Sequence, residues 1–180
     1  MLIKDIQIEI ISADITTLHV DAIVNAANKY LMAGGGVCGA IHKAAGIELE
    51  QECNTLDGCA TGQAKITNGY NLAAKFVIHT VAPQWFDGNR NEAGLLASCY
   101  KESMQLANTN GVKSIAFPAL GCGIYRYPIE EACKIAVREV VNALNNETCI
   151  EKVVFACVQL DVKDNLETEL KSVGLGVLHQ

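Results

Sequence analysis

Apolar and polar residues follow one another in short blocks whose spacing changes along the chain. Near the start, Ile6, Ile8 and Ile10 alternate with polar residues, which is the period of a half-buried strand. Residues 20–27 then form a nearly continuous apolar run that ends before Asn28, as expected of a strand that is buried on both faces. These two blocks predict the first two strands of a sheet.

Helices and further strands alternate over the rest of the chain. Apolar residues recur at helical intervals in four stretches, at about 37–53, 92–108, 128–145 and 163–173. Short apolar runs lie between them and are expected to be strands, at 65–67, 76–81, 114–117 and 152–158. Alternating strands and helices predict an α/β fold, in which helices cover both faces of one mixed, largely parallel sheet.

Nothing in the sequence divides the chain, so we expect a single domain over residues 1–180. Half of the residues are hydrophobic and 19% are charged, which excludes a disordered protein. No apolar stretch approaches the roughly 20 residues of a membrane-spanning helix. Charge at Lys4 and Asp5 comes too early for a secretory leader. The expectation is a cytoplasmic monomer that does not contact a membrane.

The charge balance argues against nucleic acid as a partner. The chain has 14 Lys and Arg residues against 20 Asp and Glu, a net charge of −6, and no window clusters the basic residues. Proteins that bind nucleic acid need such clusters to neutralise phosphates. An anionic ligand would have to be held by backbone N–H groups and helix ends.

The eight cysteines, at 38, 53, 59, 99, 122, 133, 149 and 157, form no CxxC pair. Cysteines scattered among apolar neighbours are typical of small core residues in a reducing compartment. No pair of ligands has zinc-finger or zinc-ribbon spacing. We therefore expect no disulfide, no metal and no cofactor.

Two glycine-rich segments follow strands and precede helices. We call residues 29–36 the first glycine loop and residues 119–126 the second glycine loop. Glycines allow close approach to a ligand, and N–H groups at a helix start can bind an anion without a lysine. Neither segment has Walker or GxGxxG spacing, which disfavours an ATPase or an ordinary dinucleotide site. Taken alone, each is as consistent with a tight turn as with a phosphate site; together they suggest a pyrophosphate held from two sides.

Several runs of residues resemble the macro domain family, and the MacroD-type group in particular. They are residues 13–16 (ADIT), 20–28 (VDAIVNAAN), 34–46 (GGGVCGAIHKAAG) and 123–128 (GIYRYP). The resemblance implies a three-layer α/β/α fold and a cleft for ADP-ribose, free or attached to a protein. It also implies hydrolysis of ADP-ribosyl esters on acidic side chains, with possible deacetylation of O-acetyl-ADP-ribose as a second activity.

The same resemblance assigns roles to individual residues. Asp14, next to Ile15, would accept a hydrogen bond from the adenine amino group. Asn28 would bind the distal ribose, and Asn25 would help to hold its loop. The diphosphate would lie between two sets of loop residues: Gly34, Gly35, Gly36 and Val37, and Gly121, Cys122, Gly123, Ile124 and Tyr125. Tyr125 would also pack against the distal ribose.

Catalysis is assigned to Asn28, Cys38 and His42. Here the sequence departs from the family pattern, because MacroD-type hydrolases have an acid at the position of Cys38. The residues alone also allow structural roles. Asp14 could cap a short helix, Asn25 and Asn28 could be turn residues, and Tyr125 and His42 could be core residues. His79, within an apolar strand, is expected to be a core histidine with satisfied hydrogen bonds.

Three functions therefore stay open. The first is a hydrolase of ADP-ribosyl esters, in which the ligand's own phosphate orients the water. The expectation of a macro domain without a fused effector favours this enzyme, because a reader module usually needs one. The second is a reader that binds ADP-ribose without catalysis, which the replacement by Cys38 favours. The third is a thiol enzyme with Cys38 activated at a helix N-terminus beside His42.

Overall fold

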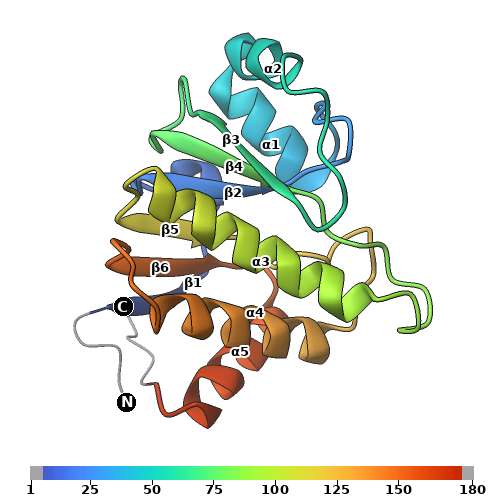
Figure 1. Ribbon diagram of the computed structural model, residues 1–180, viewed down its shortest axis with the longest axis vertical. Coiled ribbons are helices and arrows are strands. Elements are labelled where there is room, and N and C mark those ends of the chain that lie inside the picture. The colour runs from blue at the N-terminus through green and yellow to red at the C-terminus, as the bar shows by residue number, and fades with distance from the viewer. Residues whose placement is uncertain (1–5, 176–180) are drawn as a thin grey trace.

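A six-stranded sheet forms the centre of the computed structural model, which describes residues 6–175 (Figure 1). The strand order is β1-β6-β5-β2-β4-β3, and every pair is parallel except β3 with β4. The strands are β1 (Gln7–Ile11), β2 (Ala22–Ala26), β3 (Ala64–Asn68), β4 (Phe76–Thr80), β5 (Ser114–Phe117) and β6 (Lys152–Ala156). The predicted mixed, largely parallel sheet is confirmed. Lys4 and Asp5, used above against a leader, lie outside the described residues.

Helices cover both faces of this sheet. They are α1 (Gly36–Ala45), α2 (Ile47–Cys53), α3 (Glu92–Thr109), α4 (Ile129–Leu144) and α5 (Leu160–Ser172), with a short 3₁₀ helix η1 (Ile15–Thr17). In Figure 1, α3 and α4 lie side by side, and α1 and α2 lie at the β3 end of the sheet. None of the helices in residues 6–175 is long and apolar enough to cross a membrane.

Strand β2 shows why its sequence is apolar on both faces. Ala22 and Val24 belong to the core shared with α3, α4 and α5, whereas Ile23 belongs to the core shared with α1 and α2. Alternate side chains of one strand point to opposite faces of a sheet, so β2 contributes to both cores. The structure has the three-layer α/β/α arrangement that the resemblance implied.

Three predicted boundaries were wrong. The helix predicted over 37–53 is two helices, because Gly46 has φ +91° and its N–H bonds to the carbonyl of His42 as a C-cap. Pro128 is the N-cap of α4 and not part of its first turn. The last helix begins at Leu160, three residues earlier than predicted, because β6 ends at Ala156 and not at 158.

Candidate functional site

A cleft of about 650 Å³ opens where the parallel strands β2, β5 and β6 end. Loops at the carboxyl ends of strands are the usual ligand sites of α/β folds. The cleft is lined by Ala13, Asp14, Ile15, Ala26, Ala27, Asn28, Gly34, Gly35, Gly36, Val37, Cys38, Ala40, Ala82, Pro118, Ala119, Gly121, Cys122, Gly123, Ile124, Tyr125, Ala156, Cys157, Val158, Gln159 and Val162. Every predicted ligand residue is in this set except Asn25, and of the predicted catalytic residues only His42 is absent.

The first glycine loop is shaped by the side chain of Asn28, directly before it. Asn28 Nδ2 donates to the carbonyl of Met32 at 2.8 Å, and the N–H groups of Tyr30 and Met32 donate to Asn28 Oδ1 at 3.1 and 3.2 Å. An amide nitrogen has two hydrogens, so one Nδ2–H stays free to face the cleft. Asn28 is therefore a turn residue and a cleft residue at once.

The first glycine loop packs so closely on helix α1 that the contact requires a glycine in the helix. A Cβ on Gly39, in the first turn of α1, would lie 2.2 Å from the carbonyl oxygen of Gly34. Helix α1 begins with Gly35 as its N-cap and without a side-chain cap. Its first N–H groups are thus available to an anion in the cleft.

The second glycine loop is held by backbone bonds and by a separate segment. The N–H of Tyr127 donates to the carbonyl of Gly121 at 2.9 Å, and Gly121 has φ +82°. The N–H of Trp85 donates to the carbonyl of Tyr125 at 2.8 Å, and the rings of Trp85 and Tyr127 are 4.8 Å apart. Ile124 is 88% exposed at the rim of the cleft.

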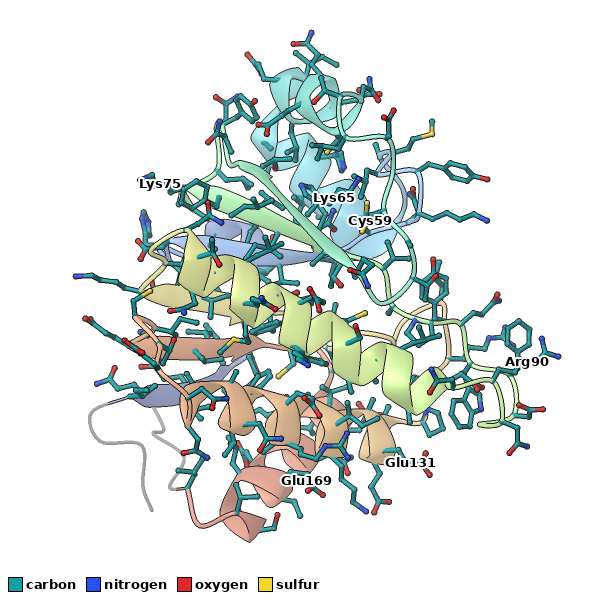
Figure 2. All side chains as sticks on the ribbon, viewed as in Figure 1. Cys59, Lys65, Lys75, Arg90, Glu131 and Glu169 are labelled. Carbon is teal, nitrogen blue, oxygen red and sulfur yellow. The ribbon has the colours of Figure 1, made fainter. Side chains whose placement is uncertain are left out.

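Residues 83–91, which carry Trp85, are organised by the carboxylate of Glu92. Glu92 accepts hydrogen bonds from backbone N–H groups of Phe86, Asp87, Gly88 and Arg90 at 2.6–3.3 Å. Burial raises the pKa of Glu92, but these backbone N–H groups outweigh it and lower the pKa to about 2. Arg90 lies at the outer end of this segment, 4.2 Å from the ring of Phe86 (Figure 2).

The position of Asp14 is compatible with both roles that the sequence left open, a helix cap and a ligand contact. It is the N-cap of η1, and its Oδ1 accepts from the N–H and the Oγ1 of Thr16 at 2.9 and 2.8 Å. Both bonds use the same oxygen, and the carboxylate lines the cleft. The second oxygen is therefore available to a ligand.

A buried polar cluster lies behind the first glycine loop. Asn25 Nδ2 lies 3.1 Å from His79 Nδ1, and His79 Nε2 lies 2.9 Å from Thr67 Oγ1. Because Asn25 Nδ2 can only donate, His79 Nδ1 accepts and Nε2 carries the proton. Burial, with a smaller contribution from His42, lowers the pKa of His79 to about 3. His79 is thus the satisfied core histidine that the sequence predicted, and it is neutral.

Cys38 joins this cluster to the cleft. The residue is 6% exposed. Its thiol donates to the carbonyl of Met32 at 3.5 Å, and Asn25 Nδ2 donates to its sulfur at 3.8 Å. Asn25 itself is fully buried, so it supports Cys38 from behind the cleft. No hydrogen bond among the described residues joins Cys38 to His42.

His42 does not line the cleft, and its ring centroid lies 6.5 Å from that of His79. His42 is buried, with a relative exposure of 7%, and neither ring nitrogen has a hydrogen-bond partner within residues 6–175. Burial lowers its pKa, and the carboxylate of Glu50 partly opposes that shift. His42 lines a second, shallower recess on the other side of Gly34.

Sequence reasoning missed the residues that support the loops from a distance. Gly39, Trp85 and Glu92 were not singled out. Only Glu92 left a signal, as an acid in the first turn of a predicted helix. The eight cysteines are all free, and no group of metal-ligating side chains occurs in the described part of the chain.

Comparison with known proteins agrees with this geometry. The macro domain family model matches residues 24–136. The chain is 56% identical over 153 residues to a macro domain-containing protein of Chlorobaculum tepidum, covering 85% of this chain and 89% of that protein. It is 51% identical over 156 residues to the O-acetyl-ADP-ribose deacetylase of Klebsiella pneumoniae, covering 84% and 89%. The Trypanosoma brucei macrodomain in complex with ADP-ribose matches with a TM-score of 0.83 and 40% identity, covering 93% of this chain and 69% of that one. The chain belongs to the macro domain family.

Proposed function

We propose that the cleft binds ADP-ribose and that the protein hydrolyses its esters, releasing mono-ADP-ribose from acidic side chains of proteins and acetate from O-acetyl-ADP-ribose. The observation that carries the proposal is the pair of glycine loops on one cleft, with the uncapped start of α1 at the first. Backbone N–H groups on both sides suit a diphosphate. The relatives from Klebsiella pneumoniae and Trypanosoma brucei bear names that fit this ligand.

The nucleoside end of the ligand would lie at Asp14. The free carboxylate oxygen of Asp14 can accept a hydrogen bond from an exocyclic amine, while the other oxygen continues to cap η1. Gln159 and Val158, which also line the cleft, follow β6 and offer no aromatic ring for stacking. Adenine recognition would then depend on Asp14 more than on stacking.

The reacting ribose would lie beside Asn28. The free Nδ2–H of Asn28 can donate to a ribose hydroxyl and so orient the anomeric carbon. In the protein ester, a water oxygen bonds to this carbon, the bond from the carbon to the carboxylate oxygen breaks, and the acidic side chain leaves as a carboxylate. The water proton passes to the ligand's own phosphate and then to solvent. Orientation of this kind is a large share of catalysis when the leaving group is already stable.

A reader without catalysis is the second candidate, and Cys38 is the observation that favours it. Among residues 6–175, Asp14 is the only carboxylate that lines the cleft, and it lies at η1 rather than on the first glycine loop. The hydrogen bond from Cys38 to the carbonyl of Met32 describes a neutral thiol. In the part of the chain that the structure describes, no side chain beside Asn28 is therefore a strong general base.

Binding is tested first, by titration calorimetry with ADP-ribose. We expect Asp14→Asn to keep the cap on η1, because an amide oxygen also accepts, and to weaken binding by about 1–3 kcal/mol. Folded wild-type protein that shows no binding would refute the proposal.

Catalysis is tested by release of ADP-ribose from a glutamyl-modified peptide. Cys38→Ala should be as active as wild type, and Cys38→Asp should be faster, by up to about 10²-fold if the new carboxylate reaches the water. Activity in Cys38→Asp alone would make the natural protein a reader. Loss of release in Cys38→Ala with binding intact would instead identify a catalytic thiol.

A further inference from the structure

The recess that contains His42 lies directly behind the first glycine loop. It has a volume of about 420 Å³ and is formed where α1 meets α2. Its walls include Gly34, Gly39, His42, Lys43, Ile47 and Glu50. Gly34 also lines the cleft, so the two cavities share one residue.

Gly34 makes the wall between the two cavities only one backbone thick. A Cβ placed on Gly34 would point toward Asn28 Nδ2 at 3.6 Å and Cys38 Sγ at 3.9 Å, on the cleft side. The opposite side of the same backbone faces the recess. A group attached to a ligand next to Asn28 therefore reaches the recess by passing over this glycine.

The recess carries polar groups that the protein itself leaves unused. The ring nitrogens of His42 are buried inside the wall, so the side chains that a ligand can reach are those of Lys43, Ile47 and Glu50. Neither Lys43 nor Glu50 belongs to an ion pair within residues 6–175. Ile47 adds an apolar surface that is 59% exposed.

We propose that this recess binds the polypeptide that carries the ADP-ribosyl ester, with Lys43 contacting the carboxylate of an acidic residue next to the modified one. The inference rests on the proposed function and extends it to the acceptor. The volume of the recess, about 420 Å³, is in the range of cavities that hold whole ligands and is far larger than an acetyl group requires. Lys43 is exposed whereas Glu50 is half-buried, so Lys43 is the more accessible of the two charged side chains in the walls.

Two glutamyl-modified peptides test the proposal, one with aspartates and one with lysines beside the modified residue, together with O-acetyl-ADP-ribose. Wild type should prefer the acidic peptide. Lys43→Glu should reduce kcat/KM for it by about three- to tenfold and reverse the preference, while hydrolysis of O-acetyl-ADP-ribose stays within about twofold. Lys101→Glu, an exposed lysine on α3 away from both cavities, is the control for the change in net charge.

The outcomes separate the two proposals. Equal effects of Lys43→Glu and Lys101→Glu, or a wild-type preference for the basic peptide, would overturn the acceptor site while leaving the hydrolase intact. If wild type hydrolyses no ester, the proposed catalysis fails, and calorimetry decides the acceptor site. The intact modified acidic peptide must then bind more tightly than ADP-ribose, and Lys43→Glu must abolish that difference.

Discussion

The two glycine loops present similar backbone to the same cleft but are held in place differently. The first loop is shaped by its neighbours in sequence, through the side chain of Asn28 and the contact between Gly34 and Gly39. The second loop is held from residues 83–91, through Trp85, at a distance of about 40 residues in sequence. Both loops are proposed to hold the diphosphate, but the first is supported by residues near it in sequence and the second by tertiary packing.

This difference predicts how each loop fails. A locally built loop depends on single atoms, so a small substitution should have a large effect. A loop supported by packing shares its support among several contacts, so single changes should have graded effects. The predictions below test that contrast, beginning with the largest expected effect.

Asn28→Ala removes the side chain that shapes the first glycine loop. It deletes three hydrogen bonds within the loop and the free donor toward the ribose. We expect turnover of a glutamyl ester to fall by about 10²-fold, since small misplacement of a reacting group has effects of that size, and ADP-ribose affinity to fall much less. Single-turnover kinetics and calorimetry measure the two quantities. Equal losses would mean that Asn28 only shapes the loop.

Gly39→Ala places a Cβ against the carbonyl of Gly34 and must displace the first glycine loop or α1. We expect the free energy of unfolding to fall by about 1–3 kcal/mol, the usual effect of overpacking, together with weaker binding of ADP-ribose. Urea unfolding measures the first effect. Gly123→Ala is the matched control in the second loop, because a Cβ there meets nothing within 4 Å. A free energy of unfolding equal to that of wild type would show that the contact between Gly39 and Gly34 does not restrict the side chain at position 39.

Mild acid should weaken the support of the first loop before that of the second. His79 has its pKa lowered from 6.5 to about 3, so its contribution to stability is complete above pH 6.5 and is lost as the pH falls toward about 3. Between pH 7 and pH 5 we expect a loss of about 2 kcal/mol from this histidine. The pKa of Glu92 is lowered to about 2, so its contribution is complete above about pH 4.5 and is unchanged in this window.

Urea unfolding at several pH values measures this loss. His79→Gln should reduce the dependence between pH 7 and pH 5 and leave a smaller part from His42, whose pKa is also lowered by burial. His19→Gln, a change at an exposed position, should leave the dependence as in wild type. A dependence as large in His79→Gln as in wild type would contradict the assignment. Trp85 is the only tryptophan, so its fluorescence reports on the segment behind the second loop.

Trp85→Ala should have the smallest effect of the series. It removes the ring packed on Tyr127 but leaves the backbone N–H that bonds to Tyr125. Aromatic pairs contribute about 0.5–1.5 kcal/mol beyond burial, so ADP-ribose affinity should fall by about three- to tenfold. Trp85→Phe should retain most of it. If ADP-ribose affinity fell by about 10²-fold in Trp85→Ala, as turnover is expected to fall in Asn28→Ala, the second loop would be no more tolerant of substitution than the first.

The sequence predicted those parts of the molecule that depend on local pattern. Alternation and apolar runs identified the strands, and β2 in particular is apolar because it faces two cores. Asp14, Asn28 and the two glycine loops were identified because resemblance and local chemistry agreed. Cys38 was also expected beside the cleft, where the structure has it.

The remainder depended on contacts that local pattern does not encode. Gly46 divides the predicted helix over 37–53, although apolar spacing continues through it. Cys38 and His42 lie on one face of α1, four residues apart, yet only Cys38 lines the cleft, because His42 is one helical turn farther along and its ring lies beside that of His79. Trp85 and Glu92 reach the cleft only through tertiary packing, which a single sequence does not reveal.

The cleft is also notable for its electrostatics. None of the residues that line it, all of which belong to the described chain, has a positively charged side chain, and Asp14 is acidic. A diphosphate would therefore be held by the dipoles of backbone N–H groups, which attract no counterions that binding must displace. Binding by lysines and arginines weakens steeply as ionic strength rises, because condensed ions must be displaced and charges are screened. Binding in this cleft should stay nearly constant as salt changes, and polyanions that outcompete ligands at basic sites should have little effect.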